Sequence, residues 1–139
     1  MRRIEFPMTQ RAYPSLRSAW TLTAVAVGYA CILFWATHAP DVRPPAIGPP
    51  GVPSDKIFHF LGYAALAFLV IASVVAWRGR RVAVLIAIVA LVVVAGIDEV
   101  TQPLTHRDAE LADWCADAAG VFVGARVAQR LFEMVCPSG

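Results

Sequence analysis

The chain contains 139 residues, of which 58% are hydrophobic and 16% are charged, and its net charge at pH 7 is +2. Soluble domains are about 45–50% apolar, and four apolar blocks exceed what one soluble core of this size can bury, so we expect an all-α integral membrane protein. The small net charge, and the lack of basic residues interleaved with aromatic ones, exclude a nucleic-acid partner.

The first two apolar blocks are long enough to cross a bilayer as helices. Residues 18–37 cover about 20 positions, more than the roughly 7–15 apolar residues of a signal peptide, so we expect an uncleaved helix. Residues 57–77 follow Ser54 and Asp55, and either residue type is favoured as the cap of a first helical turn.

The next two blocks complete a predicted bundle of four transmembrane helices. Residues 82–97 are rich in β-branched side chains, but their uninterrupted length exceeds the roughly 9–11 residues of a spanning strand and therefore predicts a helix. The last block is residues 114–135. Trp20, Trp77 and Trp114 stand at the ends of blocks, as in the aromatic belt of a membrane protein.

The basic residues predict how this bundle is oriented. Four arginines lie in the N-terminal tail and three in the turn at 78–81, whereas the proline-rich loop 38–55 and the loop 98–113 hold few basic residues. The positive-inside rule then places both termini in the cytoplasm and both of these loops outside it. The expected organisation is a basic cytoplasmic tail (1–17), a transmembrane domain (18–135) and a short C-terminal tail (136–139).

Polar residues gather at the extracytoplasmic ends of the predicted helices. Asp55, His59 and Tyr63 share one helix face because they are four residues apart. Ionisable side chains at this depth usually face the bundle interior and pair with one another. We therefore expect a single pocket that is lined by Asp55, Lys56, His59, Glu99, Gln102, Arg107, Asp113 and Asp117.

The fourth block carries both carboxylates and small residues on one face. Asp113 and Asp117 are followed at the same spacing by Gly120 and Gly124. The small-xxx-small pattern of the two glycines favours close approach of another helix. Gly120 and Gly124 are therefore the predicted helix-packing residues, and the carboxylates should point into the bundle. By contrast, we interpret Asp98 and Asp108 as solvated loop charges.

The chemistry of these polar residues leaves several roles open. His59, Glu99 and Asp117 are the candidates for catalytic residues, since proton transfer needs such groups. His59, Glu99, Asp113 and Asp117 are also residue types that bind metals. No spacing among them is diagnostic of a metal site, however, and the three cysteines have no CxxC spacing, so we expect neither a metal nor another cofactor.

The order and spacing of these polar residues resemble the VanZ-like family, which is named after a teicoplanin-resistance accessory protein. The resemblance spans roughly residues 20–130 and rests on Asp55-Lys56-x-x-His59, Glu99-x-x-Gln102, Arg107, Asp113, Asp117 and Gly120-x-x-x-Gly124. Many members have Asn at the position of Asp117, so this chain adds a negative charge. The resemblance implies a small multi-pass protein of the bacterial cytoplasmic (inner) membrane, connected with the cell envelope and glycopeptide antibiotic resistance.

Two functions from different classes follow as hypotheses. In the first, a non-enzymatic envelope protein binds a membrane lipid, a cell-wall precursor or a glycopeptide through the headgroup. In the second, a membrane-embedded enzyme acts on a lipid phosphate or a cell-wall precursor, with His59 as acid or base and Lys56 and Arg107 holding an anion. A proton or cation pathway ranks last, because the first and third helices carry no charge in mid-membrane. The sequence leaves the oligomeric state and the enzyme question open.

Overall fold

The computed structural model describes residues 15–40, 45, 51, 53–77 and 81–135. Within these residues the chain is all-helical, without strands, which confirms the all-α part of the expected fold class. The elements are α1 (Leu16–His38), α2 (Ser54–Ala76), α3 (Arg81–Thr101), the 3-10 helix η1 (Gln102–Thr105) and α4 (Leu111–Val135). Residues 1–14 of the predicted N-terminal tail, the C-terminal tail 136–139, residues 78–80 of the basic turn and most of the proline-rich loop lie outside the described residues.

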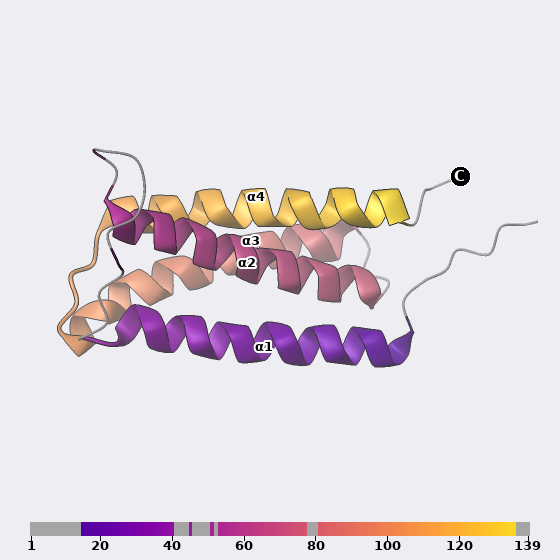
Figure 1. Ribbon diagram of the computed structural model, residues 1–139, viewed down its shortest axis with the longest axis horizontal. Coiled ribbons are helices and arrows are strands. Elements are labelled where there is room, and N and C mark those ends of the chain that lie inside the picture. Colours follow the sequence, from indigo (N-terminus) through magenta and orange to yellow (C-terminus); the bar gives the residue numbers. More distant parts are fainter. Residues whose placement is uncertain (1–14, 41–44, 46–50, 52, 78–80, 136–139) are drawn as a thin grey trace, which may run out of the picture.

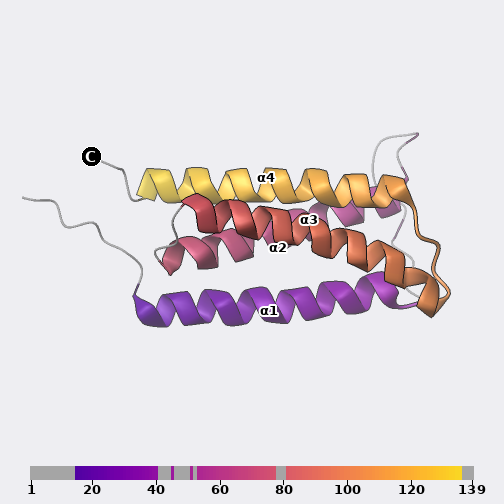
Figure 2. The ribbon, with the colours of Figure 1, turned by 180° about the vertical axis from the view of Figure 1, so that it is seen from behind.

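The four long helices lie side by side and alternate in direction (Figures 1 and 2). Leu16 and Val135 therefore lie at one end of the bundle. The opposite end, which we call the polar end, is formed by the last turns of α1 and α3, by η1, and by the first turns of α2 and α4. The predicted pocket residues all belong to this end.

Three of the described helices are long and apolar enough to cross a membrane, which indicates a multi-pass membrane protein. They are α1, α2, and α3 together with η1 (Arg81–Thr105). α4 is equally long but is not among them. Its charged side chains are spread along the helix, namely Asp113, Asp117, Arg126, Arg130 and Glu133.

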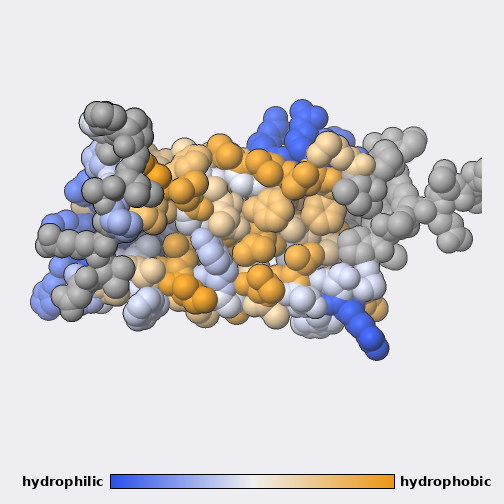
Figure 3. Space-filling view, in the orientation of Figure 1, coloured by the Kyte–Doolittle hydropathy of each residue, from blue (hydrophilic) through white to orange (hydrophobic). Residues whose placement is uncertain are grey.

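The surface of the bundle agrees with contact to lipid. In the view of Figure 3, hydrophobic residues cover the middle of the molecule, and hydrophilic residues lie at the polar end, over the second half of α4 and at the opposite end. Large apolar side chains on α1 and α3 are exposed, for example Trp35 at 65% and Ile86 at 64%. Apolar faces of this extent on several helices are typical of a protein surrounded by lipid.

Small residues allow α4 to pack closely against α2. A Cβ atom on Gly120 would overlap the backbone carbonyl of Phe60, and a Cβ atom on Gly124 would overlap that of Ala64. Val121, Ala125 and Ala128 on the same helix are completely buried. This approach of the two backbones brings the first turns of α2 and α4, with their ionisable side chains, into contact.

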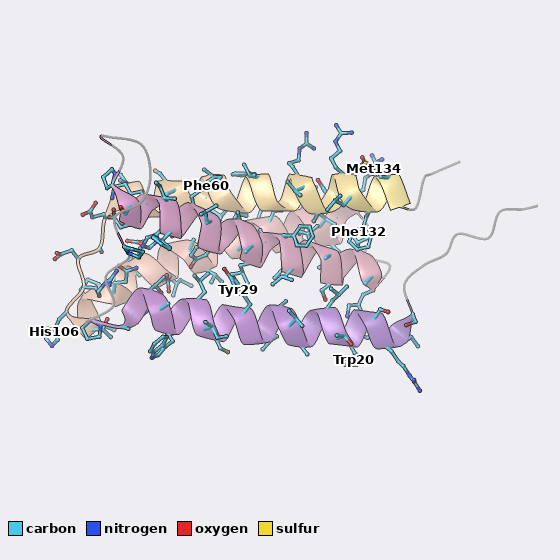
Figure 4. All side chains as sticks on the ribbon, viewed as in Figure 1. Trp20, Tyr29, Phe60, His106, Phe132 and Met134 are labelled. Atoms are coloured by element: carbon cyan, nitrogen blue, oxygen red, sulfur yellow. The ribbon has the colours of Figure 1, made fainter. Side chains whose placement is uncertain are left out.

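α1 packs against α2 through a few polar contacts. The Tyr29 hydroxyl of α1 donates to the Gly62 carbonyl at 3.2 Å, and Figure 4 shows this side chain pointing from α1 toward α2. Near the other end, the Thr23 and Ser73 hydroxyls are 2.7 Å apart, and Trp20 meets Trp77 edge to face with ring centroids 4.9 Å apart. At the polar end, a cavity lies between α1 and α2.

Two helix ends differ from the sequence-based expectation. The residue that caps α2 is Pro53, which makes no side-chain cap bond, so neither Ser54 nor Asp55 has the predicted capping position. α3 continues through Thr101 and is followed directly by η1, so the third loop does not begin at Asp98. The apolar run ends at Ile97, but helical geometry continues because the next polar side chains find partners inside the bundle.

Candidate functional site

Lys56 is the centre of an ion-pair cluster at the edge of the polar end. Its Nζ atom lies 2.8 Å from an Asp113 oxygen, 2.7 Å from Glu110 and 3.3 Å from Asp55. Asp113 is buried, whereas Glu110 is exposed. The cluster joins the first turn of α2 to the start of α4, because one ammonium group pairs with carboxylates from both. Glu110 was not among the predicted site residues.

His59, Glu99 and Asp117 form a deeper group in which three helices meet. The His59 Nδ1 atom lies 3.0 Å from an Asp117 oxygen and 3.8 Å from a Glu99 oxygen. All three side chains are buried, with Asp117 at 0% exposed. The helix spacing that predicts these side chains to face inward thus brings together the three residues that are the catalytic candidates.

Two further groups hold the Glu99 carboxylate in place. Gln102 donates from Nε2 to Glu99 Oε1 at 3.2 Å, and the backbone N–H of Glu110 donates to Glu99 Oε2 at 3.0 Å. Gln102 is 1% exposed, because η1 turns it back into the bundle. The tight turn after α3 therefore orients a carboxylate as well as connecting two helices.

Asp98 is buried, at 3% exposed, and its interpretation as a solvated loop charge was wrong. Thr37 donates to its Oδ1 atom at 3.1 Å, and His38 Nδ1 lies 3.5 Å from the same oxygen. The Tyr63 side chain also interacts with Asp98. Asp98 therefore connects α1 to α3 at the polar end.

A periodic signal in the sequence identifies Asp98 as an inward residue. Leu91, Ala95, Asp98 and Gln102 are spaced by three or four residues and are all buried. This is the spacing of one helix face. An extension of the apolar face of α3 beyond Ile97 would have included Asp98. Thr37 and His38, its partners on α1, carry no comparable signal.

Arg107 lies in the segment between η1 and α4 and is half-buried. It donates to the Ala39 carbonyl at 3.4 Å, which ties this segment to the end of α1. The nitrogen-bearing ionisable side chain that the structure brings beside Glu99 and Asp117 is His59. Arg107 lines both of the cavities at the polar end.

Two neighbouring cavities share the residues Asp55 and Arg107. The first, of about 490 Å³, runs between α1 and α2 and is walled mainly by apolar side chains such as Ile32, Leu33 and Phe58, with His59 at its polar end. The second, of about 420 Å³, is polar and adds Gln102, His106, Asp108, Glu110 and Asp113. Figure 4 places His106 at the outer tip of the polar end.

The combined site can hold a molecule with both an apolar and a polar part. Arg107 offers a guanidinium group, which binds phosphate and carboxylate groups through fork-shaped hydrogen bonds. The His59–Asp117 contact is also the arrangement that orients an imidazole for proton transfer. Comparison with known proteins adds nothing to this description, since no family model, curated protein or solved structure matches the chain.

Proposed function

We propose that this chain is a VanZ-like protein of the bacterial inner membrane that binds an envelope lipid at its extracytoplasmic polar end. The family assignment is supported by the ordered motif from Asp55 through Gly124 and by the convergence of its polar members. A role of this kind includes resistance to glycopeptides such as teicoplanin, with a lipid-linked cell-wall precursor or the glycopeptide itself as ligand.

The observation that carries this proposal is the junction of an apolar cavity with a polar one. An acyl chain fits the groove between α1 and α2, whose wall includes Ile32, Leu33 and Phe58. The headgroup then lies beside Asp55 and Arg107, the two residues that line both cavities. Ligand sites are typically apolar pockets with a few convergent polar groups.

The charges of the polar cavity favour a headgroup that carries both a phosphate and an amine. Arg107 supplies a cation for the phosphate. The same cavity is also lined by four carboxylates, Asp55, Asp108, Glu110 and Asp113, and Lys56 contacts three of these. Because carboxylates outnumber the lysine and arginine side chains, a purely anionic headgroup is disfavoured relative to one with an ammonium group.

Lipid binding can be measured by native mass spectrometry of the full chain released from nanodiscs containing phosphatidylethanolamine and phosphatidylglycerol. We expect bound phosphatidylethanolamine in excess of phosphatidylglycerol. Arg107→Ala should weaken binding by roughly tenfold or more, since hydrogen bonds to charged groups are worth about 1.5–3 kcal/mol. The control is Arg130→Ala, which removes an exposed arginine paired with Glu133 at the far end of α4. Equal lipid retention by the two variants would contradict the proposal.

We further propose that all four helices cross the membrane and that both termini are cytoplasmic. The arginines before α1 and near the end of α4 support this orientation. A reporter enzyme that is active only in the cytoplasm should be active when it is fused after residue 139. A reporter enzyme that is active only outside the cytoplasm should be active when it is inserted in the loop between α1 and α2. A C-terminus found on the extracytoplasmic side would refute the four-span topology.

The alternative function is a membrane-embedded enzyme that acts on a lipid phosphate or a cell-wall precursor. The contact of 3.0 Å between His59 Nδ1 and Asp117 favours it, because a carboxylate in this position orients the ring and leaves Nε2 to transfer a proton. In this hypothesis Arg107 holds the substrate anion. Incubation in the same nanodiscs distinguishes the two functions, since an enzyme converts the bound lipid to a product of different mass and a binding protein returns it unchanged.

A further inference from the structure

We propose that His59, Glu99 and Asp117 form a binding site for one divalent transition-metal ion such as Zn²⁺. The three residues come from α2, α3 and α4, and each offers a ligand atom within 4.8 Å of the other two. Groups at this separation can meet at one ion, since Zn–N and Zn–O bonds are about 2.0–2.2 Å long. The inference concerns a metal ion and does not depend on whether a lipid binds in the adjoining cavity.

The charge balance of the buried group points to a cation. Asp98 has Thr37 and His38 as partners, and Asp113 has Lys56. Glu99 and Asp117 share only His59 within ion-pair distance among the described side chains. A protonated His59 would still leave one net negative charge on the group. A divalent ion bound to a neutral His59 compensates both carboxylates, as buried charges require.

The Asp117 side chain supplies independent evidence that a ligand belongs here. The residue is 0% exposed, and its buried Oδ2 atom has no hydrogen-bond partner among the described residues. A buried, unpaired carboxylate oxygen is costly. Coordination of a metal ion would satisfy this oxygen and give the carboxylate a reason to lie so deep between α2 and α4.

The Glu99 carboxylate has the supporting contacts expected of a metal ligand. Both of its oxygens are oriented, one by the Gln102 amide and the other by the Glu110 backbone N–H. Hydrogen bonds of this kind hold ligands in position around a metal. Because these contacts already orient the Glu99 carboxylate before an ion binds, metal binding needs little rearrangement of the bundle.

The ligand types select the class of ion. One imidazole nitrogen and two carboxylates suit Zn²⁺ and related transition metals, whereas Ca²⁺ and Mg²⁺ prefer oxygen ligands alone. Three protein ligands also leave a coordination position open. His59 also lines the apolar cavity, so the proposed metal site lies next to the cavity in which a lipid would bind. The other acidic group, Asp55, Glu110 and Asp113, already surrounds the Lys56 ammonium and is not proposed as a site.

The sequence alone disfavours a metal because the three ligands are far apart in the chain. His59 and Glu99 are separated by most of α2 and α3, and Asp117 lies on the next helix. A metal site can be recognised from sequence spacing only when at least two of its ligands lie on the same turn or strand. The packing of α2 against α3 and α4 brings together the ligand atoms that the spacing does not connect.

Metal binding can be tested on the full-length protein in detergent, purified without a polyhistidine tag. After chelator treatment, we expect isothermal titration to show uptake of one Zn²⁺ per chain, with no comparable uptake of Mg²⁺. X-ray absorption of the Zn²⁺-loaded protein should show nitrogen and oxygen ligands at about 2.0–2.2 Å, including imidazole. Sulfur ligands at about 2.3 Å would instead indicate binding to one or more of the three cysteines of the chain.

Two isosteric variants and one matched control locate the ion. Glu99→Gln and Asp117→Asn should each weaken Zn²⁺ binding by more than the roughly 10–100-fold that loss of a supporting contact causes. Glu133→Gln, on the exposed far end of α4, should bind as the unmodified protein does. Absence of Zn²⁺ uptake by the unmodified protein, a sulfur-ligated ion, or unchanged affinity in a folded Asp117→Asn variant would each overturn the proposal. If neither variant folds, the titration and ligand spectrum of the unmodified protein decide.

Discussion

Gly124→Ala is expected to destabilise the protein by about 3 kcal/mol, the upper end of the usual cost of overpacking a core. The added methyl group would overlap the backbone of Ala64, and a backbone atom cannot move aside by a change of rotamer. The whole of α4 must then shift away from α2. That shift would also separate the first turns of the two helices and loosen the contact between His59 and Asp117.

Thermal unfolding in detergent, followed by circular dichroism, measures this effect. The matched control is Gly28→Ala in α1, where an added Cβ atom would meet nothing within 4 Å. Because Ala favours a helix over Gly by about 1 kcal/mol, the control should be neutral or slightly stabilising. Equal losses of stability in both variants would show that the close approach of α2 and α4 is not what the glycine provides.

His59→Leu is expected to cost about 3–5 kcal/mol, the usual effect of removing one partner from a buried ion pair. The substitution leaves Glu99 and Asp117 facing each other without the imidazole that contacts both. Chemical denaturation in chelator-containing buffer isolates this effect from any contribution of a metal ion. His106→Asn is a suitable control, since His106 is exposed and Asn tolerates its positive φ of 61°.

A double variant shows whether the loss comes from the pair itself. His59→Leu combined with Asp117→Leu removes a charge from each side, so we expect the combined loss of stability to be smaller than the sum of the single losses. Residues that share one interaction typically give such non-additive effects. Strict additivity would mean that the 3.0 Å contact between the two side chains contributes nothing to folding.

At the polar end, helix periodicity predicts the burial of some polar residues but not of others. The four-residue spacing of Asp55, His59 and Tyr63 predicts a common inward face, and His59 and Tyr63 are indeed buried. The apolar run of α3 ends at Ile97, one residue before the buried Asp98, so the apolar pattern alone does not include this residue. Glu110 was also missed because it lies in a connecting segment, where no period applies.

The partners of individual charges depended on distances that no spacing rule provides. Lys56 contacts Glu110 and Asp113, which are more than fifty residues away along the chain. His59, rather than a lysine or arginine, lies beside Glu99 and Asp117 among the described residues. Which cation reaches which carboxylate depends on how each helix is rotated about its axis and on where the loops end.

By itself, the sequence determined that the chain is all-helical, that it is apolar enough for a multi-pass membrane protein, and that its polar residues cluster at one end. It predicted four spans, and three of the described helices are long and apolar enough to cross a membrane. These conclusions hold because a long apolar run in lipid must satisfy its backbone groups within a helix. The tertiary structure alone decided that His59, Glu99 and Asp117 meet and that Lys56 contacts Glu110. The physical reason is that Gly120 and Gly124 set the distance between α2 and α4, and the sum of all side-chain contacts sets the rotation of each helix.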